Sequence, residues 1–149
     1  MKLHTTVQSP KEGTVVDEQP KVPYVPTHAD YLQFLVDSQH VYQALEEIVN
    51  DRPELEPFRA TKLERVAPLE LDIQYMSSTY GLDRPTVSPA GTFYATHLRS
   101  ITSVPEFMCH FYNFYFAHTA GGRMIGKQMS SLLLEKKTLE FYKWDGDLN

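Results

Sequence analysis

Apolar residues between positions 30 and 52 recur at steps of three and four, the spacing that places them on one face of a helix. This face comprises Tyr31, Leu32, Phe34, Leu35, Val41, Tyr42, Leu45, Ile48 and Val49. Thr27 or Asp30 can cap the beginning of the helix, and Pro53 follows its end. The pattern therefore predicts an amphipathic helix that begins close to Asp30 and buries one broad face.

A second, weaker helical pattern runs from about Thr61 to Tyr80, and Gly81 stands where a C-terminal stop is expected. Pro68 removes one backbone hydrogen bond and clashes with the carbonyl four residues earlier, so we expect it to kink or restart this helix. The inward positions of the pattern are Leu63, Val66, Leu69, Ile73 and Met76.

The other segments complete a helical plan. Residues 10–28 contain four prolines and no periodicity, which indicates an extended loop. Residues 85–91 (PTVSPAG) form a connector, and Thr92 to Thr102 predict a further helix. Because no segment alternates as a strand does, the fold class predicted is all-α.

Val104 to Lys137 is the segment richest in aromatic residues. Before Gly121 its apolar residues surround nearly the whole helix, which predicts burial on most sides. This aromatic cluster is typical of a protein core, with the lining of a cofactor pocket as the alternative. It comprises Phe107, Phe111, Tyr112, Phe114, Tyr115 and Phe116, and helical spacing resumes after the glycines with Ile125, Met129, Leu132 and Leu133.

Gly121, Gly122 and Gly126 interrupt this helical pattern, and each costs about 1 kcal/mol relative to alanine in a helix interior. A glycine pair permits a kink and brings bare backbone close to a flat ligand. Tight packing of two helices, or a helix end, is the alternative. His118 and Arg123 flank the pair. Both could face a polar pocket beside the glycines. The alternative is that His118 is a core or rim histidine and Arg123 a solvated charge.

Length and charge narrow the classes of function. A chain of 149 residues suits one domain covering 1–149, and a net charge of −5 without a basic stripe argues against nucleic acid as a partner. Cys109 has no second thiol and lies in an apolar run, which predicts an inert core position in a reducing compartment. The other histidines, His28, His40, His97 and His110, show no metal-ligand spacing with one another.

The chain resembles plant-type heme oxygenase in several segments. The most specific is the eighteen-residue CHFYNFYFAHTAGGRMIG at 109–126, accompanied by LEFYKWDG at 139–146 and MKLHT at 1–5. The segments YLQFLVDSQHVYQALEEIV at 31–49 and LER at 63–65 resemble the same family in the same order. The similarity covers essentially the whole chain and implies the multi-helical heme oxygenase-like fold.

In this family heme lies between a proximal helix carrying one histidine and a kinked distal helix built around glycines. The resemblance makes His4 the axial ligand of the iron, through one ring nitrogen, and places Gly121 and Gly122 over the distal face, with Gly126 also binding heme. Heme is then both cofactor and substrate. The implied reaction uses dioxygen and electrons from reduced ferredoxin to yield biliverdin, ferrous iron and carbon monoxide.

The resemblance also assigns polar roles. His118 stands where other branches of the family have an aspartate that supports a proton-delivering water network, Arg123 helps to position that network, and Tyr112 matches a tyrosine near a heme propionate. Acidic ferredoxin would need a positive patch, although a solvated helix face is an equally good reading of the same cations. The candidates are Arg123, Lys127, Lys136, Lys137 and Lys143.

Departures from the family predict a fold that is incomplete at both ends. The C-terminal helices that follow KWDG in the family, with their propionate-pairing Arg and Lys, are absent, which should weaken heme retention. Pro10 leaves His4 on at most about two helical turns, too few for a stable isolated helix. Uncovered apolar surface then predicts association with another chain.

These departures leave a catalytically impaired heme-binding or regulatory protein as the alternative function. By resemblance we expect the plastid stroma as the location, although MKLHTTVQSPKEG shows neither a transit peptide nor a secretory segment. No stretch approaches the roughly 18 to 20 apolar residues that a membrane span requires.

Overall fold

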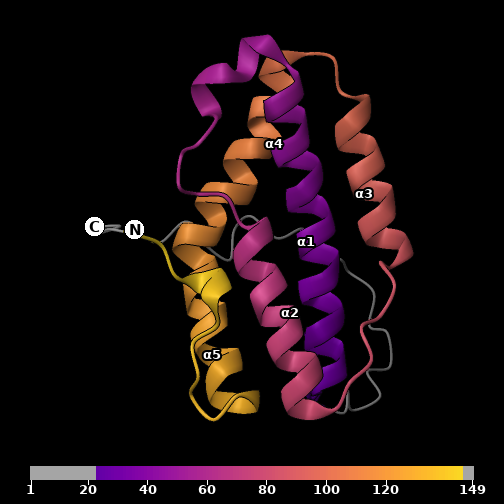
Figure 1. The fold of residues 1–149 in the computed structure, drawn as a ribbon, viewed down its shortest axis with the longest axis vertical. Helices are drawn as coiled ribbons and strands as arrows, with labels where there is room; N and C mark the ends of the chain where they lie inside the picture. The colour runs from indigo at the N-terminus through magenta and orange to yellow at the C-terminus, as the bar shows by residue number, and fades with distance from the viewer. Residues whose placement is uncertain (1–22, 146–149) are drawn as a thin grey trace, which may run out of the picture.

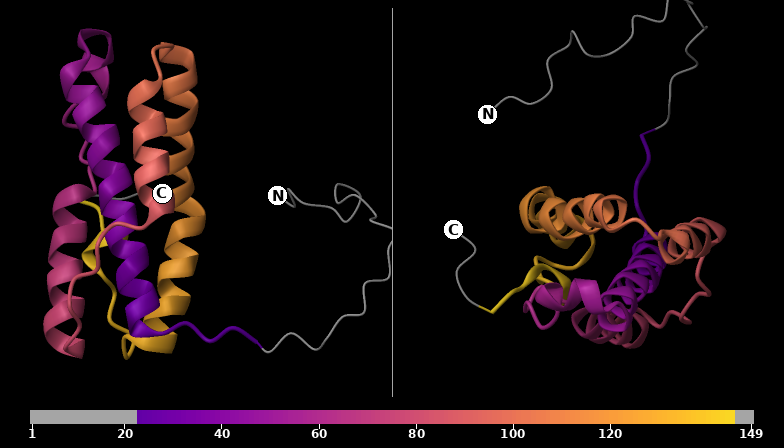
Figure 2. Two further views of the ribbon diagram at one scale, coloured as in Figure 1. Left: turned by 90° about the vertical axis from the view of Figure 1, so that its right-hand side faces the viewer. Right: turned by 90° about the horizontal axis from the view of Figure 1, so that it is seen from above.

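The computed structural model describes residues 23–145, and these residues form α-helices, short helical turns and no strand (Figure 1). Helix α1 (His28–Asp51) runs through the middle of the bundle and packs against both α2 (Val66–Tyr80) and α3 (Pro89–Ser100). Helix α4 (Val104–Ala117) passes through a π-helical turn, η2 (His118–Gly122), into α5 (Arg123–Leu133). The three form one nearly continuous rod beside α1 (Figure 2), and the all-α prediction is confirmed.

Helix α1 begins with a reciprocal cap. The Thr27 hydroxyl accepts from the backbone N–H of Asp30 at 3.1 Å, and the Asp30 carboxylate accepts from the Thr27 backbone at 3.0 Å. Of the two candidate caps, Thr27 is the residue that holds the N-cap position. The predicted apolar face is buried except for Phe34. In the core it packs with buried side chains of the other helices, among them Leu69, Ile73, Met76, Leu98 and Phe107.

Helix α2 starts five residues later than predicted, and Pro68 does not kink it. The carboxylate of Glu46, on α1, accepts from the backbone N–H of Arg65 at 2.7 Å and of Val66 at 3.3 Å, so a neighbouring helix fixes where α2 begins. Pro68 therefore lies in the first turn, where its missing N–H would have had no intrahelical partner. Gly81 ends the helix in the left-handed conformation (φ 62°), as predicted.

Helix α3, in contrast, starts earlier than expected, at Pro89 rather than Thr92. The Ser88 hydroxyl caps it by accepting from the Gly91 backbone at 3.3 Å. Asp37 on α1 accepts from both the backbone and the hydroxyl of Ser88, at 2.8 and 2.6 Å. A side chain of α1 thus also sets where α3 begins.

The prediction that α4 is buried on most sides is wrong. Phe107, Phe111 and Tyr115 are buried, but Tyr112 is 59% exposed and Phe116 49%. Only one face of α4 packs on the core of the described residues, because α4 lies at the edge of the bundle. Cys109 is likewise exposed, which corrects its predicted core position. The apolar side chains exposed on α4 and α5 are Tyr112, Phe116, Met124, Ile125 and Leu132.

Two further predictions concern the rest of the chain. Helical spacing after the glycines was followed in the sequence as far as Leu133, and α5 ends at that residue; Glu135 and Lys136 adopt positive φ angles of 49° and 68° in the turn that follows. Residues 23–27 have no regular structure, as the loop prediction requires, and residues 10–22 lie outside the described range.

Within residues 23–145, no helix combines the length and apolarity needed to cross a bilayer.

Candidate functional site

The glycines at the bend between α4 and α5 serve different contacts. A Cβ added to Gly122 would lie 2.5 Å from Nδ1 of His118, and one added to Gly126 would lie 2.6 Å from the ring of Tyr142. Both positions therefore require glycine for packing inside the chain. Gly121 differs, because it is exposed and a Cβ there would meet nothing within 4 Å. Its bare backbone is available to an external ligand.

His118 is held against the segment that returns after α5. Its Nε2 lies 2.8 Å from the carbonyl oxygen of Phe141, and the two rings stack with centroids 3.9 Å apart. A carbonyl oxygen only accepts, so Nε2 carries the proton and Nδ1 keeps its lone pair. Burial lowers the pKa of His118 to about 4, against a smaller opposing effect of this hydrogen bond. The imidazole is therefore neutral at physiological pH.

A cavity of about 340 Å³ lies between α1 and the bend, next to His118. The hydroxyl of Tyr42 donates to the Phe114 carbonyl at 3.1 Å and so links α1 to α4 at this point. Such a mostly apolar hollow with a few polar groups is typical of a small-molecule site. Its lining comprises Phe34, Ser38, Tyr42, Asn113, Phe114, Ala117, His118, Gly122, Ile125, Phe141 and Tyr142.

Two buried charged residues hold the returning segment η3 (Glu140–Tyr142), and sequence reasoning missed both roles. The Asp72 carboxylate accepts from the backbone N–H groups of Glu140 at 2.8 Å and Phe141 at 2.7 Å. The guanidinium of Arg65 donates to the carbonyls of Phe141 at 3.3 Å and Lys143 at 2.6 Å. Asp72 lies three residues after Leu69 and four before Met76, on the same face as the predicted inward positions. That placement was the available signal, because a buried carboxylate requires partners.

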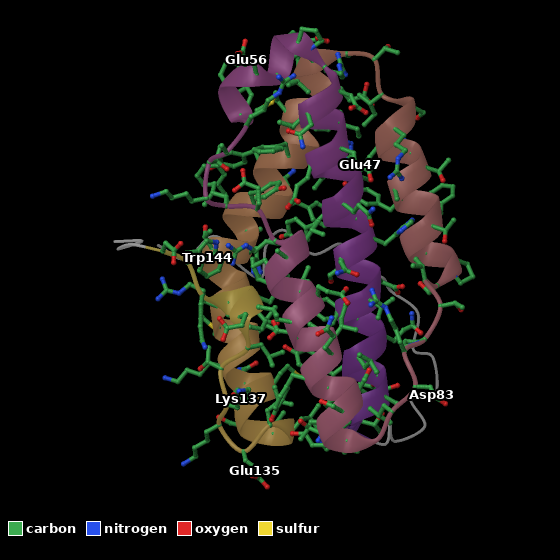
Figure 3. The ribbon with its side chains drawn as sticks, in the orientation of Figure 1. Glu47, Glu56, Asp83, Glu135, Lys137 and Trp144 are labelled. Carbon is green, nitrogen blue, oxygen red and sulfur yellow. The ribbon has the colours of Figure 1, made fainter. Side chains whose placement is uncertain are left out.

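The ring of Trp144 covers Arg65, with the guanidinium carbon 4.9 Å from its centroid, and lies 5.1 Å from the ring of His118. Figure 3 shows Trp144 beside the lower part of α4, where the chain passes the bend. The segment after α5 thus closes over His118 and contributes three aromatic rings to its surroundings, those of Phe141, Tyr142 and Trp144.

The other predicted site residues lie outside this cavity or outside the described range. Tyr112 is exposed and stacks on Phe116 at 4.6 Å. Arg123 is also exposed and lines a second hollow, of about 530 Å³, together with Lys127 and Lys136. The structure therefore does not bring Tyr112 or Arg123 into the cavity beside His118. His4, the predicted iron ligand, lies outside the described residues.

The five candidate cations of the positive patch fall into two groups. Arg123, Lys127 and Lys136 surround the second hollow. Lys137 instead lies over the ring of Tyr75 at 4.4 Å, and Lys143 forms an ion pair with Glu140. Three of the five cations therefore share one surface.

Comparison with known proteins adds independent findings. Residues 21–148 match the family described as Heme oxygenase. Over the whole chain the sequence is 42% identical to "Heme oxygenase 1, chloroplastic" of Arabidopsis thaliana and 46% identical to the protein of that name from Oryza sativa subsp. japonica. Over 84% of the chain it is 39% identical to "Probable inactive heme oxygenase 2, chloroplastic" of the same rice.

The chain spans about half the length of these relatives, 55% of the Arabidopsis protein and 53% of the first rice protein. The family match covers most of the chain and includes the bend with its glycines, His118 and the returning segment. The resemblance seen in the sequence is thereby confirmed, and the chain belongs to the heme oxygenase family.

Proposed function

We propose that this chain acts in the oxidative cleavage of heme to biliverdin, ferrous iron and carbon monoxide, with dioxygen and electrons from reduced ferredoxin. The observation that carries the proposal is the neutral, half-buried imidazole of His118 beside an apolar cavity at a glycine bend. The plastid stroma is the proposed location, supported by the word "chloroplastic" in the names of three relatives.

The residues at the bend fit a flat, apolar macrocycle. Gly121 offers backbone without a side chain, and the adjoining α5 exposes 55% of Ile125 and 67% of Met124. An apolar ring placed there would cover apolar surface now facing water, at roughly 25 cal/mol for each Å² removed. Gly121, Gly122 and Gly126 are the proposed heme-binding residues of the bend, and His4 is the proposed axial ligand.

Heme, when bound, would supply both the iron that activates dioxygen and the porphyrin that is oxidised. The polar control would come from this chain. Because the Nε2–H of His118 is committed to the Phe141 carbonyl, its Nδ1 can accept a hydrogen bond from a water in the cavity. With a pKa of about 4, His118 would hold and orient that water rather than donate a proton of its own at neutral pH.

The lack of a side chain at Gly122 serves this role directly. A methyl group there would lie 2.5 Å from Nδ1 and would block the lone pair that the water needs. The roles that the resemblance assigns to Arg123 and Tyr112 are part of this proposal. Arg123 would help to position the water network, and Tyr112 would lie near a heme propionate. Both are exposed, so in this proposal they act at the rim of the site.

Ferredoxin would dock on the surface formed by Arg123, Lys127 and Lys136. Three cations around one hollow give a local positive field on a chain whose net charge is −5. Lys127→Glu should slow turnover driven by reduced ferredoxin, most strongly at low ionic strength, and leave turnover driven by ascorbate unchanged. Equal slowing with both reductants would contradict docking at this surface.

A hemin titration followed by absorption spectroscopy tests the proposal. The wild-type chain should take up hemin with the spectrum of histidine-ligated iron, and His4→Ala should lose that spectrum. His97→Ala, which removes an exposed histidine on α3, is the matched control and should behave as wild type. No hemin uptake, or an unchanged spectrum in His4→Ala, would overturn the proposed ligation.

The alternative is a heme-binding or regulatory member of the family that does not turn heme over. Two relatives, 39% and 40% identical over 84% and 82% of this chain, carry the name "Probable inactive heme oxygenase 2, chloroplastic". Adding reductant and dioxygen to the hemin complex separates the two functions. Biliverdin formation supports the enzyme, whereas stable hemin without biliverdin under both ferredoxin and ascorbate supports the alternative.

A further inference from the structure

A group of metal-ligating side chains lies away from the bend, between α3 and α4. His97 stands in the last turn of α3, and Glu106 and His110 lie one turn apart on α4. One ring nitrogen of each histidine and one carboxylate oxygen all lie within 4.8 Å of one another. The sequence showed no ligand spacing between these histidines, because only the turn from α3 into α4 brings them together.

The chemistry of these three ligands selects a class of ion. Two imidazoles and one carboxylate suit Zn²⁺ and neighbouring transition metals, whereas Ca²⁺ and Mg²⁺ favour sites made of oxygen ligands. Around a tetrahedral Zn²⁺ with bonds of about 2.0–2.2 Å, ligand atoms lie roughly 3.3 Å apart. His97 and Glu106 are exposed and His110 half-buried, so small side-chain rotations can close the observed separation.

A neighbouring hydroxyl supports one of the ligands. Nδ1 of His110 lies 2.5 Å from the Tyr94 hydroxyl, and Tyr94 is itself held by stacking on Phe114 at 5.3 Å. When Nδ1–H donates to that hydroxyl, Nε2 keeps its lone pair and can bind a metal. Metal-binding histidines usually have such a partner on the second ring nitrogen, which fixes the tautomer and the ring orientation.

The surrounding charges do not oppose a cation. Arg99, two residues after His97, donates to the Glu47 carboxylate on α1 at 2.7 Å, so its charge is already paired. Glu47 is labelled in Figure 3, on the stretch of α1 that faces α3. The carboxylate of Glu106 then offers a negative charge next to two imidazoles that are neutral when they bind metal.

We propose that His97, Glu106 and His110 bind one Zn²⁺ ion, with water completing the coordination, and that this ion links α3 to α4. The site is separate from the cavity beside His118, whose lining includes none of the three ligands. Binding of Zn²⁺ to the folded chain alone would raise its melting temperature, because the unfolded chain does not hold the three groups together.

The test is a calorimetric titration of the metal-free chain with ZnCl₂, accompanied by its melting temperature. We expect one equivalent to bind and the melting temperature to rise. His97→Ala, Glu106→Gln and His110→Gln should each weaken binding at least about tenfold and abolish the rise, and Tyr94→Phe should weaken binding about tenfold through the second ring nitrogen. Circular dichroism checks that each variant is folded, and Glu106→Gln preserves side-chain size at an exposed position.

Two matched controls exclude other zinc ligands. Cys109→Ser removes an exposed thiol next to the proposed site, and His40→Ala removes a histidine from α1. Both variants should bind Zn²⁺ as wild type does. The proposal is overturned if the wild type binds no zinc, if His97→Ala binds it as well as wild type, or if Cys109→Ser loses it.

Discussion

Nε2 of His118 lies 2.8 Å from the carbonyl oxygen of Phe141, and the two rings stack at 3.9 Å. This pair joins the bend of the α4–α5 rod to a segment that reaches it only after the chain has turned back beyond α5. The contact determines which nitrogen of His118 carries the proton, and burial keeps the ring uncharged. The first two predictions below follow from this contact.

The first prediction concerns acid stability. The pKa of His118 falls from 6.5 to about 4 on folding, so between these pH values the unfolded chain binds a proton that the folded chain does not. Stability therefore falls as pH drops through this window, by at most about 1.4 kcal/mol per pH unit. His118→Gln keeps a donor for the Phe141 carbonyl and does not titrate. The free energy of unfolding of wild type minus that of His118→Gln should decrease from pH 6.5 to 4.

The difference between wild type and His118→Gln must be measured, rather than the wild-type curve alone, because Asp72 changes the pH dependence of stability in the opposite direction. Burial raises the pKa of Asp72 to about 6 from 3.8, against two backbone hydrogen bonds that lower it. Its contribution to stability is lost as pH rises from about 3.8 to about 6, so it offsets His118 in the wild-type curve. Urea unfolding at a series of pH values gives the difference, and a constant value across the window would contradict a buried neutral imidazole.

The second prediction is that Asp72→Ala destabilises the fold by about 1–3 kcal/mol, because the backbone N–H groups of Glu140 and Phe141 lose their acceptors. The same change should loosen Phe141 and so expose His118 to solvent. Urea unfolding measures the loss. Asp83→Ala is the control, since Asp83 is exposed in the connection between α2 and α3 (Figure 3) and should change stability by less than about 0.5 kcal/mol.

The third prediction separates the glycines. Gly126→Ala should cost about 1–3 kcal/mol, because its Cβ would lie 2.6 Å from the ring of Tyr142. Gly121→Ala should leave stability unchanged or raise it by up to about 1 kcal/mol, since its Cβ meets nothing. If Gly121 contacts heme as proposed, Gly121→Ala should nevertheless weaken hemin uptake. A variant that is as stable as wild type and binds hemin equally well would remove Gly121 from the site.

The fourth prediction concerns Cys109, whose exposure differs from the core position expected from its neighbours. In the native chain its thiol should react with a thiol-specific disulfide reagent at a rate close to that in denaturant, because reactivity follows access and thiolate fraction. The rate is measured by absorbance, with Cys109→Ser as the blank. Strong protection in the native state would show that another surface covers this side of α4.

The fifth prediction tests the expected association through uncovered apolar surface. The side chains of Phe116, Met124 and Leu132 are between 49% and 68% exposed on α4 and α5. Their burial between two chains would favour a concentration-dependent dimer in sedimentation. Met124→Gln combined with Leu132→Gln should shift the equilibrium toward monomer, and a wild type that is monomeric at all concentrations would contradict the prediction.

The sequence by itself determined the all-α fold class, the apolar face of α1, the stop at Gly81, the heme oxygenase resemblance and the position at which glycines interrupt the last helical segment. It also limited the cap of α1 to Thr27 or Asp30. Each of these follows from residues close together in the chain, or from a motif with a specific order. Helical periodicity also predicted which face of α1 is buried, and every apolar residue of that face except Phe34 is buried.

Only the tertiary structure decided where α2 and α3 begin, which side of α4 is buried, which glycines pack against a side chain and which one is exposed, and that His118 is neutral. It also brought His97 to His110 and gave Asp72 and Arg65 their partners. The physical reason is common to all of them. Burial and hydrogen bonding depend on groups contributed by other helices, and helical spacing within one segment carries no information about those groups.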